Sequence, residues 1–105
     1  MKRKRSKHID KQGTLYLVHH RETGQTKIGC TSDLDRRLRS LQTGIPGTVT
    51  LIFNVWCHDR YRAEAIMARK YRQHKMLGEW YTFPDELSDD VLATMTSLQV
   101  GGSRA

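Results

Sequence analysis

The chain has 105 residues, enough for one domain with a modest hydrophobic core. Its formal net charge is +7, an excess typical of proteins that bind a polyanion such as nucleic acid. No apolar run has the length of a membrane span and no stretch resembles a signal peptide, so we expect a cytoplasmic protein without a membrane partner. Its two cysteines form no disulfide or metal-binding pattern, and we expect reduced thiols.

The charge is unevenly distributed. Residues 1–12 contain six Lys or Arg and one Asp, a charge of +5, and residues 13–83 also sum to +5. Residues 84–105 sum to −3, and we predict that 101–105 form a flexible tail. We predict a disordered basic arm over 1–12 that lies along DNA phosphates, although such an arm can also serve solubility alone. The arm residues expected to bind nucleic acid are Lys2, Arg3, Lys4 and Arg5.

Two short strands are predicted first, over Leu15–Val18 and Thr26–Cys30. Both are rich in β-branched and aromatic residues, and Gly24 in the intervening loop is typical of a hairpin. Because side chains alternate between the two faces of a strand, Tyr16 should lie on the face opposite to Leu15.

A helix is predicted next, over Ser32–Gln42. Ser32 is placed to cap it and Asp35, three residues later, to complete a capping box. Apolar residues recur at helical spacing along one side and predict its buried stripe, Leu34, Leu38 and Leu41. Gly44 and a following proline should end the helix.

The second half predicts another strand and two more helices. Val49–Trp56 is the most apolar strand, and we place it at the centre of the sheet. Asp59 can cap a helix running to about His74, with Ala63, Ile66, Met67 and Tyr71 as its packing stripe. Glu79–Phe83 should return to the core as an extended segment, before a last helix over about residues 88–100. We assign the aromatic residues Trp56, Trp80 and Tyr81 to the core rather than to base stacking.

Three motifs follow one another in the first half of the chain. They are Leu15-Tyr16, then Lys27-Ile28-Gly29, then Leu34-Asp35-Arg36-Arg37-Leu38. Their order and spacing resemble the GIY-YIG nuclease superfamily over about residues 14–83. The resemblance implies an α/β fold over residues 13–100, in which a small, mostly antiparallel three-stranded sheet of β-β-α-β-α order has flanking helices and a C-terminal helix is added.

The resemblance also implies a function, hydrolysis of DNA phosphodiester bonds with a single Mg²⁺ or Mn²⁺ ion. Tyr16 would act in proton transfer from the attacking water, Arg37 would clamp the scissile phosphate, and Glu64 would bind the metal. Basic surroundings would favour the ionised form of Tyr16, whose unperturbed pKa of about 10 makes it a poor base. Further residues expected to support catalysis or contact phosphate are Lys27, Gly29, Arg36 and Arg39.

Each assignment has a structural alternative. Tyr16 can be ordinary core packing, Glu64 can pair with Arg60 one helical turn earlier, and Arg37 can pair with Asp33. Gly29 can serve the backbone alone.

The sequence also departs from the family pattern. Lys27 replaces the usual second tyrosine, Leu41 stands where many members have a histidine, and the late asparagine of several members has no counterpart. Lys-Ile-Gly with a late Gly-Glu-Trp, residues 78–80, is similar to a phage-associated branch also found in meiotically up-regulated gene products. A DNA-binding module without catalysis is therefore the alternative function, and charge alone also allows RNA. A domain of this size would cut one strand per visit or rely on a homodimer or fused partner.

Overall fold

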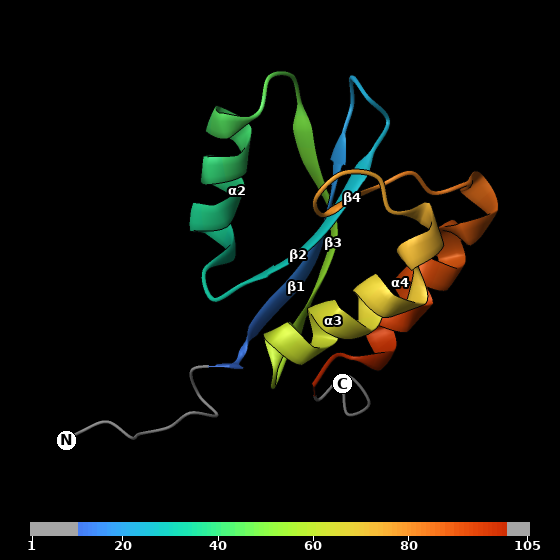
Figure 1. Cartoon of the computed structure of the whole chain (residues 1–105). Helices are drawn as coiled ribbons and strands as arrows, with labels where there is room; N and C mark the ends of the chain where they lie inside the picture. The colour runs from blue at the N-terminus through green and yellow to red at the C-terminus, as the bar shows by residue number, and fades with distance from the viewer. Residues whose placement is uncertain (1–10, 101–105) are drawn as a thin grey trace.

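The computed structural model describes residues 11–100. An antiparallel sheet of four strands, in the order β3-β1-β2-β4, is covered by helices on both faces (Figure 1). The predicted α/β fold is confirmed, with a short fourth strand added. Within residues 11–100, no helix has the length and apolar character needed to cross a membrane. The strands are β1 (Gly13–His20), β2 (Thr26–Thr31), β3 (Val49–Cys57) and β4 (Trp80–Tyr81).

Within residues 12–100, three α-helices and two 3₁₀ turns accompany the sheet. As Figure 1 shows, α2 lies on one side of the sheet and α3 and α4 lie together on the other. The helical elements are α2 (Leu34–Gly44), α3 (Arg60–Lys70), η1 (Arg72–His74), η2 (Asp85–Leu87) and α4 (Ser88–Ser97). Helix α3 ends at Lys70, earlier than the predicted His74, because the chain tightens there into η1.

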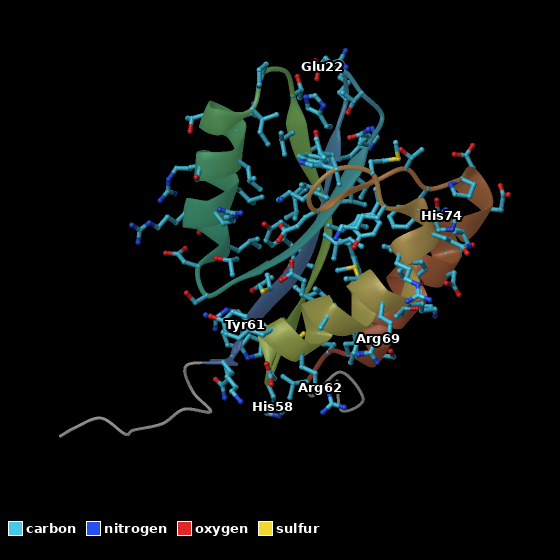
Figure 2. The ribbon with its side chains drawn as sticks, in the orientation of Figure 1. Glu22, His58, Tyr61, Arg62, Arg69 and His74 are labelled. Atoms are coloured by element: carbon cyan, nitrogen blue, oxygen red, sulfur yellow. The ribbon has the colours of Figure 1, made fainter. Side chains whose placement is uncertain are left out.

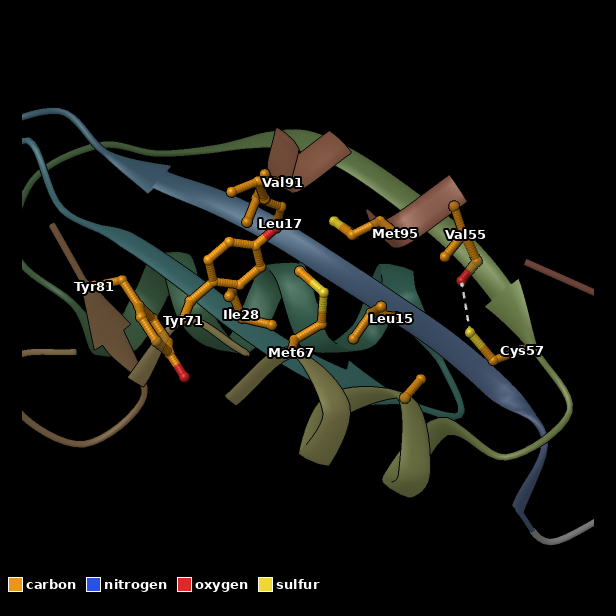
Figure 3. Packing of buried hydrophobic residues seen from close by; sticks show 11 residues of the cluster. Leu15, Leu17, Ile28, Val55, Cys57, Met67, Tyr71, Tyr81, Val91 and Met95 are labelled. Carbon is orange, nitrogen blue, oxygen red and sulfur yellow. Dashed lines mark hydrogen bonds between the residues drawn. The ribbon is translucent and has the colours of Figure 1, made fainter. Parts of the chain in front are cut away.

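Strand β1 is the buried centre of the domain. Tyr16 and Val18 face α2, in a cluster with Leu41 and other apolar residues of α2 and β3. Leu15 and Leu17 face the opposite way, into a larger cluster with residues of α3 and α4 (Figure 3). The predicted alternation along this strand is confirmed, and it gives the sheet two separate hydrophobic cores.

The prediction that Val49–Trp56 occupies the sheet centre is wrong, because β3 is an edge strand. Its pairing with β1 slips at a bulge, since Leu17 faces Phe53 while the next residue, Val18, faces Leu51. The extra residue, Ile52, is 48 % exposed. The bulge turns Leu51 toward the α2 core and Phe53 toward the α3 and α4 core, so one apolar strand serves both.

Aromatic residues follow the prediction in part. Tyr81 is buried and Trp80 is half-buried, as expected of core residues. Trp56 is 46 % exposed, which contradicts its assignment to the core. Its side chain projects from an edge strand on the exposed side of the alternation, whereas its neighbours Val55 and Cys57 are buried.

Aspartates cap α2 and α3. Asp59 caps α3 as predicted, accepting a hydrogen bond from Arg62 N at 3.1 Å. The cap of α2 is Asp33 rather than Ser32, and it accepts from Arg36 N at 3.1 Å. The helix starts later than predicted because Thr31 Oγ1 first accepts from Asp33 N, at 3.1 Å, and closes a turn after β2.

Replacing the α2 cap should weaken the domain measurably. Asp33→Ala leaves a helix-end amide without its acceptor and should lower the free energy of unfolding by about 1 kcal/mol. Asp33→Asn keeps an acceptor and should lose less. Urea denaturation of the three proteins measures these differences, and equal stability for all of them would show that the cap contributes nothing.

Candidate active site

Tyr16 extends from the centre of β1 across β2. It is 0 % exposed and lies opposite Gly29 in the strand pairing. A Cβ atom at Gly29 would lie 2.5 Å from the Tyr16 Cζ atom and closer still to Oη, so a glycine is needed for the ring to pass. At its far end, Tyr16 Oη accepts a hydrogen bond from Arg37 Nε of α2, at 3.1 Å. The structure thus brings Tyr16 and Arg37 together. Arg37 bonds to Tyr16, whereas the side chain of Asp33, its alternative partner, caps α2.

Burial dominates the chemistry of this tyrosine. Removal from water raises the pKa of Tyr16 above its ordinary value, and the hydrogen bond and charge of Arg37 only partly oppose that rise. The carboxylates of Glu64 and Glu79 raise it further. The expectation that basic surroundings favour the ionised form is therefore wrong for the protein alone. Tyr16 is a protonated phenol at neutral pH, and Arg37 donates to its oxygen.

Glu64 lies on α3 and enters the same cluster from the opposite face of the sheet. It is half-buried, and its Oε1 accepts a hydrogen bond from the Cys30 thiol of β2, with an S–O distance of 3.1 Å. Burial raises the pKa of Glu64, with a further contribution from the nearby Glu79 carboxylate. Glu64 also makes a minor contribution to the raised pKa values of Tyr16 and Arg37, so the three residues predicted for catalysis lie near one another.

Lys27 and Glu79 form an ion pair at the edge of this cluster. Lys27 Nζ lies 2.8 Å from Glu79 Oε1, and the lysine side chain is 10 % exposed whereas that of Glu79 is 50 % exposed. Burial alone would raise the pKa of Glu79, but the hydrogen bond and charge of Lys27 outweigh it, so the pKa is lowered. Glu64 and Glu79 therefore differ, one with a raised pKa and the other with a lowered one.

Strand β4 pairs with only part of β2, and side chains from both faces of the sheet meet at the part of this edge that stays unpaired. Strand β4 pairs only with Thr26 and Lys27 at the start of β2. Within the described part of the chain, no strand pairs with Gly29–Thr31 along that edge. Tyr16 reaches this open edge from one face, and Glu64 approaches Cys30 there from the other. The short fourth strand thus positions Glu79 and leaves Cys30 and Thr31 partly exposed at the unpaired part of the edge.

Carboxylate oxygens at this edge are suitable for a hard divalent cation. Glu64 and Glu79 supply oxygen donors, and a cation beside them would offset the burial and the carboxylate repulsion that raise the pKa of Glu64. Residues 11–100 contain no group of three or more His, Cys, Asp or Glu side chains arranged as metal ligands. Mg²⁺ keeps several waters and is often held by one or two carboxylates, so this donor set fits it and does not fit zinc.

Two members of the cluster are not among the predicted site residues. Glu79 belongs to the Gly-Glu-Trp segment, which the sequence marks only as a family feature, and its approach to Lys27 spans 52 positions of sequence. Cys30 follows Gly29 directly, but nothing in the sequence pairs it with Glu64. Burial and the bond to Glu64 raise the Cys30 pKa to about 12, so it donates a hydrogen bond and is no nucleophile.

Further basic residues lie around this cluster. Arg36 and Arg39 are exposed on α2, consistent with contact to solvent or phosphate. Arg60 Nη1 donates to the Gln12 carbonyl at 2.7 Å, which ties α3 to the start of β1. Figure 2 shows Arg62 and Arg69 extending from α3, where both are exposed. The basic arm residues Lys2, Arg3, Lys4 and Arg5, and the tail 101–105, lie outside the described residues.

Fold and cluster together define a small α/β domain whose polar centre combines a phenol, a guanidinium and two carboxylates. The model of the T5orf172 domain matches residues 13–96, and the chain belongs to this family. It is therefore a phage-associated domain of nuclease-like or DNA-binding character. No curated protein and no solved structure shows significant similarity to it.

Removal of the Lys27 charge should change the pKa of Glu79. In Lys27→Met the Glu79 pKa should rise, because its main stabilising cation is gone, and carbon-detected NMR titration of the carboxyl measures the change. A carboxylate with a lowered folded-state pKa contributes stability at neutral pH that is lost as the pH falls through that pKa. The stability difference between wild type and Lys27→Met should therefore shrink on acidification. A difference that is constant from pH 7 to pH 3 would contradict this assignment.

Proposed function

We propose that this chain is a metal-dependent DNA endonuclease of the GIY-YIG type, with Tyr16, Arg37 and Glu64 at its centre. The observation that carries the proposal is the hydrogen bond from Arg37 to Tyr16 at an open sheet edge that Glu64 reaches from the other face. Phosphodiester hydrolysis needs a cation for the phosphate, a group that handles the proton of the attacking water and a carboxylate for a metal. This edge offers all three.

Each residue has a definite part in the proposed reaction. Arg37 keeps its positive charge, since its bond to Tyr16 raises its pKa, and it binds a non-bridging phosphate oxygen. Most Tyr16 side chains hold their phenolic proton at neutral pH, and the ionised fraction would accept the proton of the water that attacks phosphorus. Glu64, with Glu79 beside it, would hold Mg²⁺ or Mn²⁺. When bound, such an ion neutralises phosphate charge and stabilises the leaving oxygen.

A DNA-binding module without catalysis is the second candidate. Lys27, at the position of the family's second tyrosine, is buried and paired with Glu79 and so does not supply a phenol to the reaction. The raised pKa of Tyr16 also leaves very little of it ionised, and so able to accept a proton, at neutral pH. Such a module would bind DNA equally well in chelator and in magnesium.

A pH profile of plasmid nicking tests the role of Tyr16. If the phenolate takes the proton of water, the nicking rate should rise up to about tenfold per pH unit between pH 7 and 9, because this range lies below the raised pKa. Tyr16→Phe should be about 10²–10⁴-fold slower and should lose that slope. DNA binding in chelator, measured by gel shift, should be unchanged. Wild-type rates and slope in Tyr16→Phe would remove Tyr16 from the proton transfer.

A further inference from the structure

A tight turn next to the candidate site presents two exposed apolar side chains. The chain reverses over residues 77–80, where Trp80 N donates to Leu77 O at 3.2 Å and Gly78 has a φ of +64°. Leu77 is 84 % exposed and Met76 is 55 % exposed. Within residues 11–100, Leu77 is the most exposed large hydrophobic residue.

Backbone bonds hold this turn in a fixed position. Met76 N donates to Trp80 O at 2.7 Å, and Thr82 N donates to His74 O at 2.9 Å. Beneath it, the Trp80 ring packs against Lys27, whose Nζ lies 5.5 Å from the ring centroid. Isolated exposed apolar residues are ordinary on protein surfaces. Here two adjacent ones stand on a turn that is braced by backbone hydrogen bonds.

The turn belongs to the candidate site through Glu79. This residue is part of the same four-residue turn, and its carboxylate is bound to Lys27 inside the cluster. Since the ends of such a turn lie within about 7 Å of each other, Leu77 stands in the same compact turn as a residue of the proposed site. Arg72 and Lys75 are exposed just before the turn and can meet the flanking phosphates. Along the chain, the apolar tip thus lies between two exposed cations and Glu79 of the proposed reaction centre.

We propose that Met76 and Leu77 form an apolar wedge that inserts between base pairs of a bound DNA duplex beside the scissile phosphate. This rests on the proposed DNA-directed function and adds how the duplex is engaged. Leu and Met are among the side chains that unstack base steps when a protein presents them on a rigid element. Unstacking unwinds and kinks the duplex locally, which exposes the backbone to the open edge of β2.

Unwinding of closed circular DNA tests the wedge without knowledge of a target sequence. Relaxed plasmid is incubated with the protein and a metal-independent topoisomerase in chelator, so that no metal-dependent cleavage occurs, and linking number is read after deproteinisation. Wild type should shift the linking number in proportion to bound protein. At equal occupancy of the DNA, matched by gel shift, the double variant Met76→Ser/Leu77→Ser should leave the linking number unchanged. Its affinity should lie within about threefold of wild type, because it loses both the contacts of the wedge and the cost of unstacking the bases.

Control variants separate the wedge from a general loss of exposed apolar surface and from misfolding. Ile52→Ser removes an apolar residue that is 48 % exposed on β3 and should leave unwinding intact. Leu77→Ser alone, at a largely exposed position, guards against misfolding and should reduce the shift. Equal unwinding by wild type and the double variant would overturn the wedge. The wedge would also be overturned if wild type were a dimer and the double variant a monomer, because these side chains would then form a dimer interface. Unwinding without metal-dependent nicking would overturn only the proposed catalysis, and absence of any DNA binding would overturn both.

Discussion

Glu64→Gln should abolish metal-dependent nicking while leaving the protein folded and able to bind DNA. The substitution keeps the size of the side chain and a hydrogen-bond acceptor for the Cys30 thiol, but it removes the carboxylate proposed to hold the metal. Loss of several kcal/mol of charge stabilisation in the transition state corresponds to a rate reduced at least about 10³-fold. In chelator, DNA should bind up to about fivefold more tightly, because a negative charge facing the phosphates is gone.

Glu86→Gln is the matched control for charge. Glu86 is exposed in η2 and belongs to no part of the cluster, so this variant loses the same charge without touching the site. Its nicking rate should equal that of wild type. Metal binding, followed by calorimetry with Mn²⁺ in the absence of DNA, should weaken for Glu64→Gln and not for Glu86→Gln. Equal nicking by Glu64→Gln and wild type would exclude Glu64 as the metal-binding residue.

Gly29→Ala should destabilise the domain and disable the site together. The added methyl group would lie 2.5 Å from Tyr16 Cζ, so the ring must move from its place beside Arg37. Overpacking of this kind costs about 1–3 kcal/mol, and nicking should fall at least about 10²-fold because the reacting groups lose their alignment. Urea denaturation and plasmid nicking measure the two effects.

A double-mutant cycle shows whether Tyr16 is the cause. In a Tyr16→Leu background the clashing ring atoms are absent, so adding Gly29→Ala should cost less, with a coupling of about 1 kcal/mol or more. Gly44→Ala, at the end of α2 with no atom within 4 Å of the new methyl group, should be neutral or slightly stabilising. Additive losses in the cycle would mean that the glycine is needed for some reason other than the tyrosine ring.

Local sequence patterns correctly predicted much of the fold. Alternation in Leu15–Val18 assigned the two faces of β1 correctly, and the helical spacing of the leucines identified the buried side of α2. Asp59 was found as a cap because capping depends only on residues a few positions apart. These features are set within one element and can therefore be read from a single stretch of sequence.

Features that depend on distant parts of the chain could not be read in this way. β3 looked central because it is apolar, yet a bulge at Ile52 lets an edge strand serve two cores. The family resemblance supplied Tyr16, Arg37 and Glu64, but their meeting at one sheet edge depends on tertiary packing. Glu79 enters the site only because β4 pairs with the start of β2. The raised pKa of Tyr16 likewise depends on burial by α2 and β2, which no local pattern reports.

The central claim is that this centre cuts DNA with a divalent cation, and nicking of supercoiled plasmid by the wild-type protein tests it most directly. The protein is incubated with plasmid in Mg²⁺, in Mn²⁺ or in chelator, beside Glu64→Ala, and nicked circles are counted over time. We expect nicking in at least one metal, none in chelator and none with Glu64→Ala, while all samples shift DNA on a gel. Binding without nicking in either metal would contradict catalysis and identify a DNA-binding module.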